Sequence, residues 1–183
     1  MSSTTVAAPI AAPAMRVWDP VVRLFHWSLV AGMAAEYLLE AGTRVHERVG
    51  YGLLALVGLR VVWGLVGTRH ARFADWLPTP GRLARYLASL AAGRPLHTIG
   101  HNPLGAIMIL APLGMVTLTA ASGGLSTTDA YWGVEWVEEL HEVSAWATLL
   151  LVPSHVAGVV LASILQKENL VLAMITGRKR ARA

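Results

Sequence analysis

Four long runs of hydrophobic residues, separated by more polar stretches, dominate the pattern of the chain. They cover residues 21–39, 46–66, 104–121 and 140–165. Each run is close to the ~20 residues that a helix needs to cross the hydrocarbon core of a bilayer. The pattern therefore predicts an all-α integral membrane four-helix bundle. It forms one domain over residues 16–183, which follows a flexible N-terminal tail at residues 1–15.

Charged residues in the polar stretches predict how the bundle is oriented. Basic residues gather near the first run, between the second and third runs, and at the C-terminus: Arg16, Arg23, Arg69, Arg72, Arg82, Arg85, Arg94, Arg178, Lys179, Arg180 and Arg182. The connection between the third and fourth runs is acidic and lacks Lys and Arg. Because Lys and Arg are enriched in cytoplasmic loops, both termini are expected in the cytoplasm. Residues 82–90, between two turn signals, are expected to form a short amphipathic helix at the membrane surface.

The composition agrees with a membrane protein and excludes several kinds of cofactor. Of 183 residues, 55% are hydrophobic and 14% are charged, whereas a soluble domain is about 25% charged. The net charge of +4 comes from residues that flank apolar runs, so it indicates membrane orientation and not nucleic-acid binding. The absence of cysteine excludes disulfides, thiolate-held iron–sulfur clusters and covalent c-type haem. Histidines are therefore the candidate metal ligands.

Two histidines of the last apolar run, His141 and His155, are separated by fourteen positions. In a helix this spacing places both side chains on nearly the same face, roughly 21 Å apart along the axis. With the predicted topology, His26 lies at the cytoplasmic level with His155, and His46 lies at the outer level with His141. Each level thus receives two histidines from different helices. A six-coordinate haem iron with two axial imidazoles requires this arrangement.

Other interpretations of these residues stay open at the level of the sequence. A histidine in a span often hydrogen-bonds a neighbouring helix, and a chain without cofactor would serve as a membrane anchor. Zinc is less suited, because no level collects the three or four ligands that zinc takes. Arg60 shares the face of His46 and reaches the level of His155. It is expected either to pair with a haem propionate or to snorkel towards the interface.

Several motifs, taken in order, resemble the bacterial cytochrome b561 family, in the branch that includes b-type cytochrome subunits of nickel–iron hydrogenases. The matching stretches are VWDPVVRLFHW, VHERVGYG, LRVVWGLVGTRHARFADW, GHNPLGAIMIL and LHEVSAWATLLLVPSHVAGVVLASILQKENLVLAMITGRKR. The resemblance implies a four-helix protein of the bacterial inner membrane that holds two haem b groups. It also implies His26, His46, His141 and His155 as iron ligands, paired as the depth argument pairs them.

The leading hypothesis is a dihaem cytochrome that passes electrons between a periplasmic redox partner and the quinone pool. The expected partner is a c-type cytochrome or a hydrogenase-like protein, and the acidic, aromatic loop 129–139 is its expected docking surface. His101, Lys167 and Asn169 are the candidates for contacts with a quinone such as ubiquinone. An alternative is a superoxide:quinone oxidoreductase that acts on its own. The sequence leaves open the direction of electron flow and whether the chain forms a homodimer.

Overall fold

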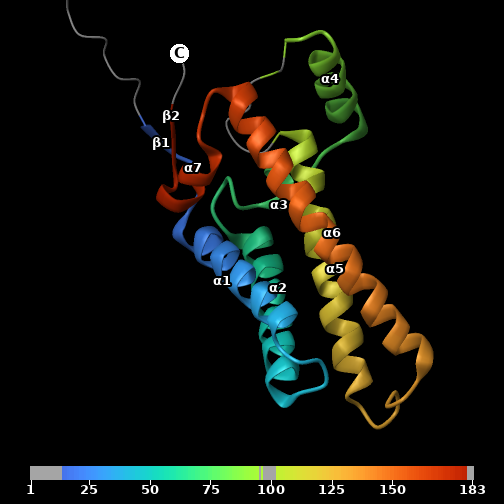
Figure 1. Ribbon diagram of the computed structural model, residues 1–183. Coiled ribbons are helices and arrows are strands. Elements are labelled where there is room, and N and C mark those ends of the chain that lie inside the picture. Colours follow the sequence, from blue (N-terminus) through green and yellow to red (C-terminus); the bar gives the residue numbers. More distant parts are fainter. Residues whose placement is uncertain (1–13, 95, 97–101, 181–183) are drawn as a thin grey trace, which may run out of the picture.

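The computed structural model describes residues 14–94, 96 and 102–180, and nearly all of its regular structure is helical (Figure 1). Its four longest helices are α1 (Pro20–Leu38), α2 (Arg44–Val66), α5 (Pro103–Ser126) and α6 (Glu135–Gln166). They correspond to the four apolar runs of the sequence. The predicted all-α class is therefore confirmed for the described residues.

Three of these helices, α2, α5 and α6, are long and apolar enough to cross a membrane. Helix α1 is not among them. Within its 19 residues it carries Arg23, His26 and Glu36, which lower its mean hydropathy. Three of the four predicted spans are thus confirmed by length and composition, and a crossing by α1 stays a prediction.

Side-chain caps fix where α1 and α2, which carry His26 and His46, begin. Asp19 accepts a hydrogen bond of 2.8 Å from the Val22 amide at the start of α1. Thr43 accepts one of 3.3 Å from the His46 amide at the start of α2. Such caps satisfy amide groups that have no partner inside the helix. As a result, His46 lies in the first turn of α2, and His26 follows within the first two turns of α1.

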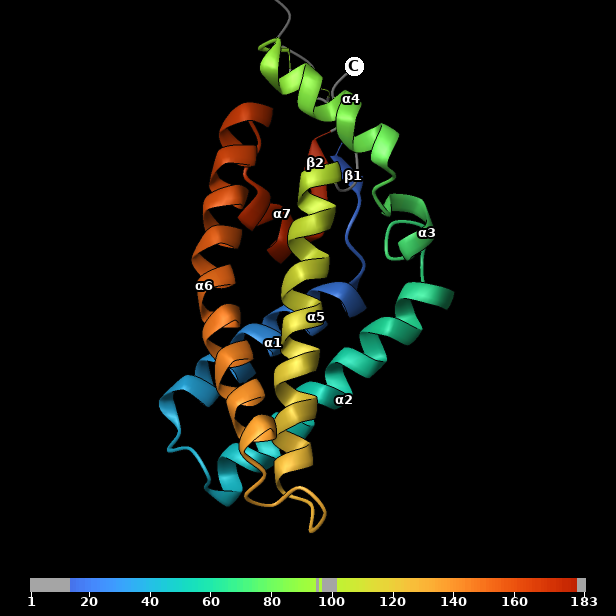
Figure 2. The ribbon, with the colours of Figure 1, turned by 90° about the vertical axis from the view of Figure 1, so that its right-hand side faces the viewer.

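The long helices form two pairs, α1 with α2 and α5 with α6, and α2 also packs against α5 (Figures 1 and 2). Helix α6 does not pack closely against α1 or α2 in the described structure. Side chains bridge these helices instead. The Tyr37 hydroxyl of α1, for example, donates a hydrogen bond of 2.6 Å to the Ala145 carbonyl of α6.

The remaining elements lie at one end of the molecule, opposite the α1–α2 and α5–α6 connections (Figures 1 and 2). They are α3 (Phe73–Trp76), α4 (Pro80–Ala91), α7 (Leu170–Thr176), β1 (Ala14–Arg16) and β2 (Arg178–Arg180). Helix α4 confirms the short helix expected at residues 82–90. Strands β1 and β2 pair antiparallel, with Ala14 opposite Arg180 and Arg16 opposite Arg178. Residues 14 and 15, assigned from the sequence to the N-terminal tail, therefore belong to a strand, while residues 1–13 lie outside the described part.

Asp19 ties the start of α1 to the end of α2 at this same end of the molecule. Its Oδ2 accepts hydrogen bonds from the Trp63 indole, at 3.1 Å, and from the Thr68 hydroxyl. Burial raises the pKa of Asp19, but these donors and the Val22 amide outweigh it, so the pKa lies below its ordinary value. The carboxylate therefore holds both helix ends in place.

Large apolar side chains cover much of the surface of the long helices. Leu24, Leu59, Leu150 and Ile164 are each about two-thirds or more exposed. Such continuous apolar exposure is unusual on a soluble monomer. It is the expected surface of helices that contact lipid chains.

Candidate functional site

Two pairs of histidine rings face each other across helices that do not pack closely. The ring centroids of His26 on α1 and His155 on α6 are 6.4 Å apart, with an angle of 44° between the ring planes. The centroids of His46 on α2 and His141 on α6 are 6.3 Å apart, with an angle of 79°. All four side chains are partly buried. The structure therefore brings together the same pairs that the sequence groups by depth.

The spacing within each pair suits one metal ion between two imidazoles. A metal–imidazole bond is about 2.0–2.1 Å and the ring centroid lies roughly 1.1 Å further, so opposed ligands have centroids about 6.3 Å apart. A direct hydrogen bond between the rings would bring the centroids to roughly 5 Å. Within the described residues no group of three or more metal-ligating side chains exists. Two ligands per site suit an iron whose other ligands come from a macrocycle.

In the pair His46 and His141, called the outer pair from here on, contacts leave one ring nitrogen of each histidine free for a metal. Nδ1 of His141 lies 2.8 Å from the Thr119 carbonyl oxygen of α5. A carbonyl oxygen only accepts, so Nδ1 carries the proton and Nε2 keeps a lone pair for a metal. Nδ1 of His46 lies 2.7 Å from Oε2 of Glu36 on α1, although the ring N–H is not aligned for a hydrogen bond. A carboxylate beside Nδ1 favours the same tautomer.

Gly123 of α5 allows the close approach that the His141 ring requires. A Cβ atom at this position would lie 2.8 Å from Cε1 and 2.9 Å from Nδ1 of His141. Any side chain here would displace the ring or the helix. The sequence alone did not single out Glu36, Thr119 or Gly123. For Glu36 a signal was present, since an acidic residue inside an apolar run is a functional candidate.

The pair His26 and His155, called the inner pair from here on, has different surroundings. Nδ1 of His26 is buried and has no hydrogen-bond partner within the described residues, while the ring contacts Trp27 edge to face at 5.0 Å. Arg60 is 6% exposed. Its Nη2 donates to the Ala71 carbonyl at 3.2 Å, and its guanidinium lies 4.9 Å from the centroid of the Phe73 ring. Nη1 of Arg60 is buried without a partner in the described part of the chain, so one amino group is free for an anion.

The candidates for quinone contacts do not form a site within the described structure. His101 lies outside the described residues. Lys167 is exposed and ends α6 in a left-handed conformation with φ of 50°. The Asn169 side chain caps α7 by accepting a hydrogen bond of 2.8 Å from the Leu172 amide.

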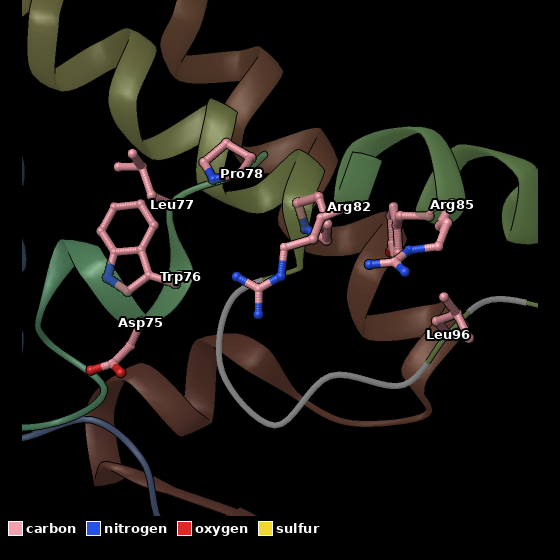
Figure 3. Close-up of a pocket in the computed structure, with 9 residues that line it drawn as sticks. Asp75, Trp76, Leu77, Pro78, Arg82, Arg85 and Leu96 are labelled. Carbon is pink, nitrogen blue, oxygen red and sulfur yellow. The ribbon is translucent and has the colours of Figure 1, made fainter. Parts of the chain in front are cut away.

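A pocket of about 280 Å³ lies between α3, α4 and the start of α5 (Figure 3). It is lined by Asp75, Trp76, Leu77, Pro78, Arg82, Arg85, Tyr86, Leu96 and Pro103. Figure 3 shows the side chains of Arg82 and Arg85 extending from α4 into the pocket. Its wall combines aromatic rings with cationic hydrogen-bond donors. Neither Lys167 nor Asn169 lines it.

Apolar helices that present opposed histidines, in a chain without thiolates, suit a membrane-bound cytochrome of the b type. The chain belongs to the prokaryotic cytochrome b561 family, whose model matches residues 17–177. It is therefore a membrane b-type cytochrome of electron transfer, and haem b is the cofactor that this class of protein carries.

Two curated relatives carry the name probable Ni/Fe-hydrogenase B-type cytochrome subunit. The relative from Bradyrhizobium diazoefficiens is 21% identical over 93% of this chain and 87% of its own length. The relative from Rhizobium leguminosarum bv. viciae is 22% identical over 89% of this chain and 87% of its own length. No solved structure matches the chain significantly.

Proposed function

We propose that the chain holds two haem b groups, one between each histidine pair, and passes electrons from one face of the membrane to the other. The observation that carries this proposal is the pair of ring spacings, 6.4 Å for His26 and His155 and 6.3 Å for His46 and His141. Both fit one iron between two imidazoles. Because His141 and His155 share α6, the two sites are roughly 21 Å apart along that helix.

Each part of the chain has a distinct task in this proposal. A bound haem supplies one-electron redox chemistry. His26, His46, His141 and His155 would hold the two irons, and two imidazoles on each iron would leave no open position for oxygen. The free Nη1 of Arg60 is the donor for a propionate at the inner site. The Thr119 carbonyl and Glu36 hold the outer ligands in the tautomer that binds metal.

The proposed topology has four crossings, with both termini at the cytoplasmic side of a bacterial inner membrane. The pairing of β1 with β2 supports an even number of crossings, because the chain enters and leaves the bundle at the same end. Helix α1 joins that end to the start of α2 at the opposite end (Figure 1), which supports α1 as the fourth crossing. The end of the molecule that carries α4 and β2 has an excess of Arg and Lys, which supports a cytoplasmic location for this end.

We expect a redox protein to dock at the outer end, beside the histidine pair His46 and His141. The connection between α5 and α6 and the first two turns of α6 carry Asp129, Glu135, Glu138 and Glu139. Trp132 and Trp136 are 76% and 55% exposed there. Acidic groups around exposed aromatic rings suit a partner with a basic face. The names of the relatives suggest a hydrogenase as this partner, and a c-type cytochrome is the second candidate.

At the inner end we expect a quinone to exchange electrons with the chain. The pocket in Figure 3 supports this expectation, since Trp76 and Tyr86 offer flat apolar walls and Arg82 offers donors for a quinone carbonyl. A few placed polar groups in an apolar wall are typical of small-molecule sites. Pro103, which lines the pocket, follows the predicted contact His101 closely in the chain.

A spectrum of the purified protein with a haem count tests the proposal. We expect a b-type α band in the reduced-minus-oxidised spectrum and about two haems per chain. A chain purified from haem-sufficient cells without this band would contradict the proposal. A single haem per chain would contradict its dihaem form.

A further inference from the structure

The two histidine pairs differ in what contacts the Nδ1 atoms of their rings. In the outer pair, Nδ1 of His141 meets a backbone carbonyl at 2.8 Å and Nδ1 of His46 meets the Glu36 carboxyl group at 2.7 Å. In the inner pair, Nδ1 of His26 has no partner among the described residues. Only the outer site therefore has an acidic group directly against a ligand ring in the described structure.

Glu36 is shielded from water at this contact. Its side chain is 12% exposed and the His46 side chain 23% exposed, so little water screens their contact. Gly50, one turn after His46 on α2, lies beside the carboxyl group, and a Cβ added there would make an ordinary contact of 3.7 Å with Glu36 Oε1. Within the described residues His46 provides the sole ion pair of Glu36. The contact thus joins α1 to the first turn of α2.

An acidic oxygen beside Nδ1 makes an imidazole a stronger donor to a metal and fixes the ring orientation. Negative charge in a site of low dielectric also favours the oxidised, more positive state of a haem iron. We propose that Glu36 is a positioning residue of the outer site and gives the outer haem the lower midpoint potential of the two. This assignment rests on the proposed dihaem function. It makes the transfer of electrons from the outer haem to the inner haem energetically downhill.

Redox titration of the full-length protein in detergent tests the proposal, with low-spin electron paramagnetic resonance as a second readout. Glu36→Gln removes the charge but keeps the size and an acceptor oxygen. Glu40→Gln is the matched control, because it removes the same charge from the exposed end of the same segment. We expect Glu36→Gln to raise the lower midpoint potential and leave the higher one unchanged. A tenfold change in redox equilibrium, or 59 mV for one electron, is the expected scale.

Glu36→Asp and Glu36→Ala keep the test decisive if Glu36→Gln loses a haem. Loss of one haem in Glu36→Gln and Glu36→Ala but retention in Glu36→Asp would support the positioning role. Loss in all three variants would overturn it, because the residue would then act through packing alone. The proposal would also be overturned if Glu36→Gln kept both haems and had the same midpoint potentials and low-spin resonance signals as Glu40→Gln. A wild-type protein without b-type haem would instead refute the proposed function itself, and this inference with it.

Discussion

Replacement of Gly123 by alanine is expected to weaken the outer haem site and spare the inner one. The added Cβ would lie 2.8 Å from Cε1 of His141, whereas ordinary contacts begin at 3.4 Å, so the ring must move by about 0.6 Å. Such overpacking costs about 1–3 kcal/mol in a packed interior. The ring is also held by the Thr119 carbonyl, so it cannot move freely. The outer haem is therefore expected to bind about 5- to 150-fold more weakly.

Gly114→Ala provides the control for this experiment. Gly114 lies on the same helix, and a Cβ added there would have no neighbouring atom within 4 Å. Both variants are incubated with an excess of a haem-scavenging apoprotein, and the haem that remains is counted over time. We expect Gly123→Ala to fall from two haems towards one while Gly114→Ala keeps two. Equal retention in both, with unchanged low-spin signals, would refute the reasoning.

Three further predictions concern the end of the molecule with the strand pair. Asp19→Ala should cost about 1 kcal/mol through the lost cap, a Tm decrease of about 2–4 °C. Because the folded-state pKa of Asp19 lies below its ordinary value of 3.8, its stabilising effect is present above pH 3.8. The Tm difference from Asp19→Asn should therefore shrink as the pH falls through the folded-state pKa, and a constant difference would argue against it. Arg60→Leu should lower the inner haem potential in a redox titration while Arg60→Lys largely preserves it; equal potentials in both would exclude a charge effect on that haem. Arg82→Gln should slow reduction of the haems by decylubiquinol but not by dithionite, with Arg94→Gln as control; an unchanged rate would remove Arg82 from the quinone site.

Hydrophobic patterning predicted the long helices because a membrane span must be apolar over most of its length. Residues 104–121 and 140–165, for instance, lie within α5 and α6 of the structure. The like-facing placement of His141 and His155 followed from helix geometry, since fourteen residues return a side chain to nearly the same face. The pairing of His26 with His155 followed from the predicted depth of each histidine in its span. Such regularities depend only on the chain within a helix and on the order of the spans.

Hydrophobic patterning and the geometry of single helices did not predict the contacts between helices. The Glu36–His46 contact depends on how α1 and α2 turn relative to each other, and no periodicity along one helix determines that angle. Gly123 shows its role only once α5 and α6 are packed, because many glycines in membrane helices serve plain packing. The pairing of β1 with β2 joins segments at opposite ends of the sequence, and strands of three residues leave little pattern to detect.

Haem content and spectra of the four single histidine-to-alanine variants test the central claim most directly. The account predicts about two haems in the wild type and about one in each variant. It further predicts that His26→Ala and His155→Ala keep the same haem, with the same potential and low-spin signal, and that His46→Ala and His141→Ala keep the other. Variants of one pair that retain different haems, or retain both, would contradict the assignment of two bis-histidine sites on α6.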